Sequence, residues 1–371
     1  MSKFKYLLIL VLLLSVNQAF AQEVYGVFGL PAGDIGKKQV GTINPSDGAI
    51  SLLGTSSSVE TGTLALTTGA TAINVAGNKS YFIARDSINA DRVYTVDLDT
   101  GITDSNPVLT SGYTTSNNWG VWYDEPNAVL YGLFDRGTDV EIATIDPVTG
   151  SVNSHDSAVV PSGATLGSGL LTGDSSGQRL FFMANEFIYV VDTSNTNTHY
   201  ALSTDDFWGG YTASYIFGLE WDKTQDALWV LYNPGSGGRN LAKIEGDISD
   251  GGEPEINTNI ELDFGDLITT SSGLSCLDTQ SSKYFFFGRP SSGVNANKWS
   301  MYTVDLIAES STNVDIEDPS VQTNGYAGIE VLPGPELSFS KDDGDISTTP
   351  GSIVTYTLSY SNAPVRRGCH H

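Results

Sequence analysis

Oxygen-bearing side chains recur at one place in a repeated strand pattern. The pattern is a small residue, an apolar residue and then the position of interest. It occurs six times, at Ala72-Ile73-Asn74, Gly120-Val121-Trp122, Gly169-Leu170-Leu171, Gly218-Leu219-Glu220, Gly273-Leu274-Ser275 and Gly328-Ile329-Glu330. Carboxylate and amide oxygens are the ligands that Ca²⁺ takes in proteins, so Glu220, Glu330 and Asn74 are candidate metal ligands if the strands converge. A polar, water-filled channel without a metal explains the same pattern.

Basic side chains form a second chemical pattern, because they gather at one kind of loop. Of the 13 Lys and Arg between residues 22 and 334, eight follow a recurring aromatic-rich strand or border the strand after it. They are Lys37, Lys38, Arg85, Arg92, Arg136, Arg239, Arg289 and Lys298. Arg recognises carboxylates through paired hydrogen bonds. The candidate binding residues are therefore Arg85, Arg136, Arg239 and Arg289.

Aromatic residues lie in the loops that enter the small-apolar strands, notably Trp119, Trp208 and Tyr211. In a propeller these loops and the basic loops emerge on the same face. Aromatic rings stack on sugar or guanidinium planes, so this face predicts binding of an acidic saccharide or of a carboxylate-bearing protein partner. Local ion pairing is the alternative, with Arg85 next to Asp86 and Arg136 between Asp135 and Asp139, since exposed pairs are common and contribute little.

A third repeat defines the strands that must position these side chains. Its clearest copy is Thr144-Ile145-Asp146-Pro147-Val148-Thr149-Gly150, a β-branched strand that ends in Asp and turns through Thr-Gly. Worn copies end at residues 44, 97, 192, 245 and 305, roughly fifty residues apart. A repeat of this length in an all-β pattern predicts a β-propeller with one blade of about four strands per repeat. The Asp-x-x-x-Gly segment is a turn signal, because Asp accepts backbone N–H bonds and Gly takes the left-handed conformation.

The order of the strands predicts how the ring closes. The chain after residue 22 opens with an aromatic-rich strand at Tyr25, and the last small-apolar strand, at Ile329, has no aromatic-rich strand after it. Pairing of these two strands completes a sixth blade and removes free sheet edges. We therefore predict an all-β, six-bladed propeller over residues 22–334, closed by its N- and C-terminal strands.

Composition favours an extracellular protein. Acidic residues outnumber Lys and Arg by 43 to 18, and the net charge of -25 argues against binding to nucleic acid or to anionic membrane surfaces. Residues 1–21 carry Lys3 and Lys5, a short apolar run and Ala19-Phe20-Ala21, which is the pattern of a secretory signal peptide rather than a membrane span. We predict a secreted or cell-surface location, with the periplasm as another destination. Cys276 is expected to be a core residue.

The C-terminal segment, residues 335–371, departs from the repeat. From Pro350-Gly351 the chain runs through Tyr356-Thr357-Leu358 to Asn362, with apolar residues on alternate positions. This stretch resembles the opening of the Ig-like conserved repeat domain of bacterial surface proteins. The resemblance implies a truncated β-sandwich repeat after a propeller head.

No compact catalytic motif appears in the sequence, neither a Gly-x-Ser-x-Gly elbow nor a Cys-x-x-Cys pair. The leading hypothesis is a non-catalytic binding or structural module with no cofactor. The competing hypothesis rests on a resemblance of the recurring channel position, with Glu220 and Glu330, to six-bladed propellers of the lactonase type, which hold a metal with residues from several blades. That resemblance implies a Ca²⁺-dependent hydrolase of the lactonase or phytase sort, acting in the central channel.

Overall fold

The computed structural model describes residues 23–30, 37–54, 69–161, 163–203, 215–234, 239–245, 255–262, 267–290, 298–316, 326–332, 337–342 and 357–362. The predicted signal peptide, residues 1–21, lies outside them, as do Trp208 and Tyr211. The chain divides into two compact units, Gln22–Leu332 and a second unit made of Met1–Ala21 with Pro333–His371. In the described part of the chain, no helix is long and apolar enough to cross a membrane.

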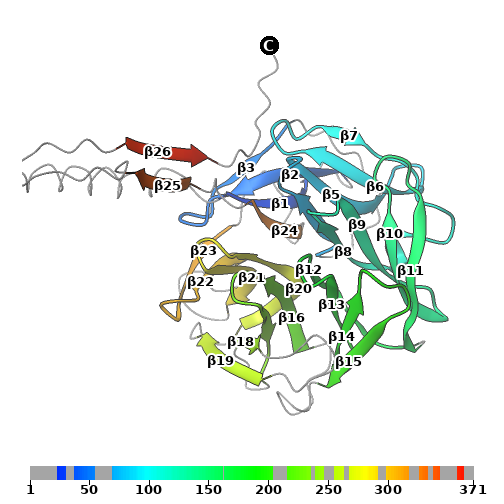
Figure 1. Ribbon diagram of the computed structural model, residues 1–371. Coiled ribbons are helices and arrows are strands. Elements are labelled where there is room, and N and C mark those ends of the chain that lie inside the picture. Colours follow the sequence, from blue (N-terminus) through cyan, green and yellow to red (C-terminus); the bar gives the residue numbers. More distant parts are fainter. Residues whose placement is uncertain are drawn as a thin grey trace, which may run out of the picture. The chain divides into compact units, whose positions relative to one another are not determined.

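Gln22–Leu332 is a six-bladed β-propeller of four-stranded antiparallel sheets (Figure 1), which confirms the predicted fold class and blade number. The first blade is β24 (Tyr326–Leu332), β1 (Glu23–Gly29), β2 (Lys38–Ile43) and β3 (Ile50–Leu52). The second is β4 (Thr71–Asn74), β5 (Lys79–Arg85), β6 (Asp91–Asp97) and β7 (Thr103–Ser105). The third is β8 (Asn118–Asp124), β9 (Val129–Asp135), β10 (Asp139–Ile145) and β11 (Val152–Pro161).

The other three blades have the same order along the chain. The fourth is β12 (Leu166–Asp174), β13 (Arg179–Ala184), β14 (Phe187–Asp192) and β15 (His199–Ser203). The fifth is β16 (Ile216–Asp222), β17 (Ala227–Tyr232), β18 (Arg239–Glu245) and β19 (Glu255–Leu262). The sixth is β20 (Leu267–Asp278), β21 (Lys283–Pro290), β22 (Ser300–Asp305) and β23 (Ser310–Asp315). One 3-10 turn, η1 (Thr115–Asn117), leads into β8.

The first blade combines strands from the two ends of the propeller. β24 runs antiparallel to β1, with Val331 opposite Val24 and Glu330 opposite Tyr25. β24 also contacts the inner strands of both neighbouring blades, β20 and β4. The six inner strands β24, β4, β8, β12, β16 and β20 therefore form a closed ring around the axis.

The hydrophobic core is divided into six clusters, one between each pair of neighbouring blades. Both faces of every blade are covered, which explains why the second and third strands are almost continuously apolar. Phe181, Phe182, Phe285, Phe286 and Phe287 are fully buried in these clusters. Cys276 is a buried free thiol in the cluster between the sixth and first blades, as the sequence predicts.

The recurring Asp-x-x-x-Gly turn also joins neighbouring blades. Asp146 accepts hydrogen bonds from the Val148 and Thr149 amides, and Gly150 has a φ of 75°. A Cβ on Gly150 would lie 2.1 Å from the carbonyl oxygen of Val108 in the preceding blade, and the Thr110 amide donates to the Gly150 carbonyl at 3.0 Å. The repeat therefore marks a turn, as expected, and the turn also docks on the outer edge of the blade before it.

The second unit contains one described sheet, in which β25 (Leu337–Asp342) pairs antiparallel with β26 (Thr357–Asn362). Leu337 lies opposite Asn362, and Asp342 opposite Thr357. β26 covers the last part, Thr357–Asn362, of the stretch that resembles the opening of an Ig-like repeat, and residues 350–356 lie outside the described residues.

We expect a substitution at the contact between inner-strand glycines to lower the free energy of unfolding. In Gly273→Ala, the new Cβ would lie 2.5 Å from the Cα of Gly169 at a φ of 71°. Left-handed backbone costs a non-glycine residue about 1–2 kcal/mol, and overpacking adds about 1–3 kcal/mol. We expect the free energy of unfolding, measured in urea, to fall by about 3 kcal/mol.

Gly137→Ala is the matched control, because Gly137 has a φ of 79° and nothing within 4 Å of its added Cβ. This variant should lose only the conformational cost, about 1 kcal/mol. Equal losses in the two variants would show that the glycines at the axis do not constrain the fold.

Candidate functional site

The inner strands are of two kinds that alternate around the ring. In β8, β16 and β24, a glycine precedes Trp122, Glu220 or Glu330 by two residues, and these residues lie opposite Tyr131, Trp229 and Tyr25. In β4, β12 and β20, a glycine precedes Thr71, Leu171 or Ser275 by two residues, and these lie opposite Phe82, Phe182 and Phe286. Counted back from the turn that follows each inner strand, this position in β4, β12 and β20 lies one residue earlier than in β8, β16 and β24. Alternate blades therefore present different positions to the axis.

Each shifted strand contributes a side chain that meets its neighbour from an unshifted strand. Ser275 Oγ donates a hydrogen bond to Glu220 Oε1 at 2.8 Å. Thr71 Oγ1 donates to Glu330 Oε1 at 3.2 Å. Glycines allow these approaches, because a Cβ on Gly218 would lie 2.6 Å from Ser275 Oγ and a Cβ on Gly328 would lie 2.3 Å from Thr71 Oγ1. Two hydroxyl–carboxyl pairs therefore line the axis.

Three further glycines lie where the shifted strands meet. Gly69, Gly169 and Gly273 all have positive φ, and a Cβ on Gly69 would lie 2.5 Å from the Cα of Gly273. The backbones of three alternate blades thus approach one another two residues before Thr71, Leu171 and Ser275. We call this contact the glycine constriction.

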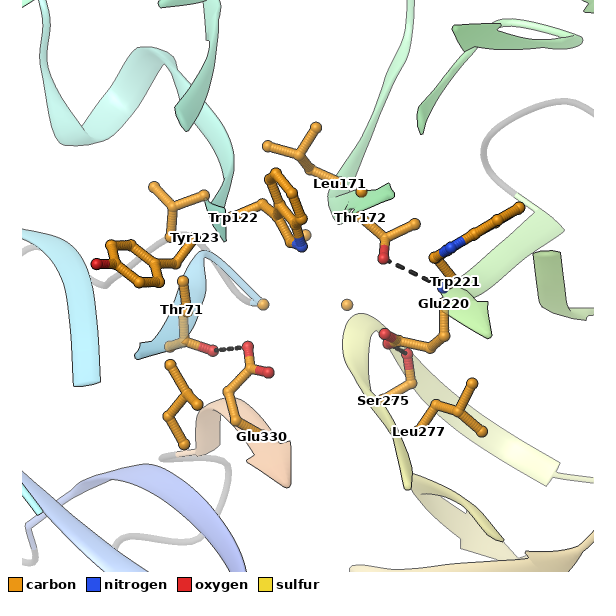
Figure 2. Close-up of a pocket in the computed structure, with 17 residues that line it drawn as sticks. Thr71, Trp122, Tyr123, Leu171, Thr172, Glu220, Trp221, Ser275, Leu277 and Glu330 are labelled. Atoms are coloured by element: carbon orange, nitrogen blue, oxygen red, sulfur yellow. Dashed lines mark hydrogen bonds between the residues drawn. The ribbon is translucent and has the colours of Figure 1, made fainter. Parts of the chain in front are cut away.

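A cavity of about 190 Å³ lies along the axis and is lined by residues of these inner strands. The lining begins at the glycine constriction and reaches Tyr123 and Leu277, farther along their strands. Figure 2 shows Glu220 and Glu330 on different sides of the cavity, with Trp122 and Thr172 also facing it. The structure therefore brings two of the three predicted oxygen ligands into one site.

Burial sets the electrostatics of the two carboxyl groups. It raises the pKa of Glu220 to about 8, although the hydrogen bond from Ser275 acts in the opposite direction. Burial, followed by the charge of Glu220, raises the pKa of Glu330 well above its usual range, and the Thr71 hydrogen bond opposes this. At neutral pH the cavity therefore favours protonated carboxyl groups.

Asn74 does not belong to this site, and its prediction as a channel residue is wrong. Its Oδ1 accepts a hydrogen bond from the Gly77 amide at 2.6 Å, and its Nδ2 donates to the Tyr123 hydroxyl at 3.0 Å. Asp124 and Asp222 occupy the same place in their blades, where they accept hydrogen bonds within the turn after the inner strand. Asn74 is likewise a turn residue.

Thr71 is the residue that the sequence analysis missed in this blade. The correct small-apolar pattern is Gly69-Ala70-Thr71, three residues before the pattern assigned at Ala72-Ile73-Asn74. Gly69 was the available signal, because the other five copies all begin with glycine.

The cavity fits a calcium ion poorly. Ca²⁺ takes six to eight oxygen ligands, several of them ionised carboxylates. In the described residues, no group of three or more His, Cys, Asp and Glu side chains gathers to hold a metal ion. The two glutamates present share their oxygens with hydroxyl donors, and Asn74 is elsewhere.

Two of the four predicted arginines are engaged inside the fold. Arg85 forms a two-point ion pair with Asp91, with both N–O distances at 3.0 Å, so its partner differs from the predicted Asp86. Asp86 instead pairs with Arg92. Arg239 is 5% exposed, lies 4.4 Å over the ring of Phe217, and has its pKa lowered to about 10 by burial. Arg239 therefore does not belong to an exposed basic rim.

Arg136 and Arg289 stack on aromatic rings at the loops where they were expected. The Arg136 guanidinium lies 4.2 Å from the ring centre of Tyr113, and Arg289 lies 5.9 Å from that of Trp299. Tyr113 also donates a hydrogen bond to Glu141 at 2.5 Å. Trp119 packs, partly buried, against the core between the third and fourth blades. Arg136, Arg289 and Trp119 thus contact an aromatic ring or the core, while Trp208 and Tyr211 lie outside the described residues.

The raised pKa of Glu220 predicts how stability depends on pH. The unfolded chain releases this proton near pH 4.5 and the folded chain near pH 8, so deprotonation favours unfolding between these values. Wild-type protein should lose stability relative to Glu220→Gln as the pH rises from about 4.5 to 8, as measured by Tm. Ser275→Ala removes a hydrogen bond that lowers this pKa, so its loss of stability should extend to higher pH. Parallel Tm profiles for all three proteins would contradict the assignment.

Comparison with known proteins identifies the fold and no family. No protein-family model and no curated protein matches the sequence. The crystal structure of TolB from Acinetobacter baumannii has a TM-score of 0.54 and 15% sequence identity, over 85% of this chain and 67% of that one. A nidogen/laminin complex has a TM-score of 0.50 and 10% identity, over 84% and 98%. A protein from Lactobacillus plantarum has a TM-score of 0.49 and 11% identity, over 84% and 99%. At these identities the likeness to the first two structures shows a shared fold alone.

Proposed function

We propose that this chain is a non-catalytic binding module of a secreted or cell-surface protein, and that its arginine-bearing loops bind an acidic glycan. The site is the Arg136–Tyr113 stack, formed by the loop between β9 and β10 and the segment before β8. The observation that carries the proposal is the state of the Arg136 guanidinium. Its Nη1 is buried against Tyr113 and has no hydrogen-bond partner in the described part of the chain.

A charged donor without an acceptor destabilises the free protein, by about 1–3 kcal/mol or more. The Arg136 side chain as a whole is half-buried, so a uronate carboxylate or a sulfate at this loop can contact its guanidinium and supply an acceptor. The Tyr113 ring holds the guanidinium plane in place, so little side-chain freedom remains to be lost on binding. Arg85 lacks this property because Asp91 already occupies its guanidinium.

The proposed location rests on the sequence. The signal-peptide pattern of residues 1–21 and the net charge of -25 support a protein outside the cytoplasm. The strands β25 and β26 carry the residues that resemble an Ig-like surface repeat, so we place the propeller as a head before such a repeat.

A protein partner is the other occupant that these loops suit, and one of the similar structures is a complex of nidogen with laminin. A hydrolase using the axial cavity is the weaker candidate, because only Glu220 and Glu330 of its proposed ligands line that cavity. We therefore assign binding rather than hydrolysis to the chain.

Arg136→Ala should weaken binding to oligouronates or sulfated oligosaccharides at least about tenfold, since a hydrogen bond to a charged group contributes about 1.5–3 kcal/mol. A glycan array followed by calorimetry with the best ligand would measure this change. Tyr113→Phe retains the stacked ring and loses only the hydroxyl, so it should bind nearly as well as wild type.

Arg85→Ala is the matched control, because it removes an arginine of a comparable loop that is already paired with Asp91. It should leave glycan affinity unchanged while lowering stability. Failure of wild-type protein to bind any acidic saccharide, or equal losses for the two arginine variants, would overturn the proposal.

A further inference from the structure

The axial cavity contains acids and no base. Of the 17 residues that line it, Glu220 and Glu330 are the two with carboxyl side chains, and no lining residue is Lys, Arg or His. Without a basic neighbour a buried carboxyl group stays protonated, because burying an uncompensated charge costs free energy. A positively charged ligand would supply the missing partner and allow the two carboxyl groups to ionise.

The two acids keep free hydrogen-bonding capacity. Ser275 and Thr71 each bond to one oxygen, Oε1, of Glu220 and Glu330 respectively. The second oxygen of each has no hydrogen-bond partner among the described residues. A group with several N–H donors, placed between the two glutamates, satisfies both oxygens.

An unpartnered donor lies in the same wall. Trp221 lines the cavity and is 8% exposed, and its indole Nε1 has no hydrogen-bond partner in the described chain. Figure 2 shows the nitrogen-bearing edge of this indole on the cavity side of the ring. Phe181 stacks on the same ring at 5.1 Å, which fixes its orientation. An oxygen acceptor bound in the cavity would therefore satisfy this N–H group.

Aromatic rings complete the lining. Trp122 and Tyr123 border the cavity beside the acid pair. Aromatic faces attract organic cations. A volume of about 190 Å³ is well above the roughly 30 Å³ that one water occupies in the liquid and below the roughly 300–1,000 Å³ of pockets for drug-sized ligands. The cavity thus fits a small molecule.

We propose that the axial cavity is a binding site for a small amino alcohol, with its ammonium group between Glu220 and Glu330 and its hydroxyl oxygen accepting from Trp221 Nε1. The glycine constriction forms one end of the site. The opposed carboxyl groups select a positive charge, the indole selects an oxygen acceptor beside it, and the cavity volume limits the size. This site is separate from the Arg136–Tyr113 stack and does not depend on the glycan proposal.

Proton linkage follows from this arrangement. Burial raises the pKa of Glu220 to about 8, so binding of an ammonium ion to the carboxylate displaces a proton at neutral pH. Affinity should therefore rise between pH 6 and pH 8, where the free carboxyl group ionises and the amine stays charged. A neutral or anionic ligand would show no such rise.

The experiment titrates the full chain with ethanolamine by calorimetry in phosphate buffer, which avoids amine buffers that would compete. We expect binding that tightens at least about tenfold from pH 6 to pH 8. Ethylene glycol, which lacks the ammonium group, should not bind. Ethylamine, which lacks the hydroxyl, should bind more weakly than ethanolamine.

Three variants test the roles of the named groups. Glu220→Gln and Glu330→Gln keep the shape of the neutral acids and should each weaken ethanolamine binding at pH 8 at least about tenfold. Trp221→Phe keeps a stacked ring and should abolish the preference for ethanolamine over ethylamine. Arg136→Ala should leave ethanolamine binding unchanged, which separates this site from the glycan site.

Several results would overturn the proposal. They are equal affinity for ethanolamine and ethylene glycol, or binding that survives both Gln variants when circular dichroism shows them to be folded. Calcium binding that requires both glutamates, without any binding of ethanolamine, would identify a metal site instead. Absence of ethanolamine binding to wild type between pH 6 and pH 9 would also refute the assignment.

Discussion

The close approach of six inner strands at one axis is the constraint on which the rest of the structure depends. Six β-strands with full side chains do not fit side by side around so narrow a centre. The chain meets this constraint with a glycine two residues before the axis-facing position of each inner strand, and this glycine occupies one of two registers. In three blades the glycine admits the neighbouring side chain, as Gly218 admits Ser275, and in the other three it admits neighbouring backbone, as Gly69 admits Gly273.

This alternation determines the chemistry of the axis. A shift of one residue between neighbouring strands brings residues of unlike positions together in pairs, and two of the three pairs are a hydroxyl with a carboxyl. The third pair is apolar, because Leu171 and Trp122 occupy the corresponding places, and a Cβ on Gly120 would lie 2.8 Å from the Leu171 Cβ. The cavity wall is therefore polar around Glu220 and Glu330 and apolar around Trp122 and Leu171, which would orient a bound molecule.

The sequence was sufficient for the fold class and the number of blades, because turns and apolar strands recur with a regular period. Glu220 and Glu330 were also found, since each follows a Gly-apolar pair. Thr71 was not, because a second plausible pattern three residues later was chosen at Asn74. The ion-pair partners of the arginines could not be predicted from the sequence, for another reason. Asp86 and Asp91 lie at opposite ends of one loop, and only the paired strands β5 and β6 show that Arg85 meets Asp91 while Arg92 meets Asp86.

The two ends of each blade differ in charge, and this difference explains why one propeller presents two unlike sites. The inner strands finish with acids such as Asp222 and Asp278, whose oxygens hold the following turns. Arg136 and Arg289 lie at the other end, where the rings of Tyr113 and Trp299 contact them, and there Arg85 and Arg92 pair with Asp91 and Asp86. Burial keeps the two carboxyl groups at the axis protonated at neutral pH, while positive groups remain local to the loops. With a net charge of -25, the whole molecule repels anions and attracts cations, so an acidic ligand must meet the stacked arginines directly.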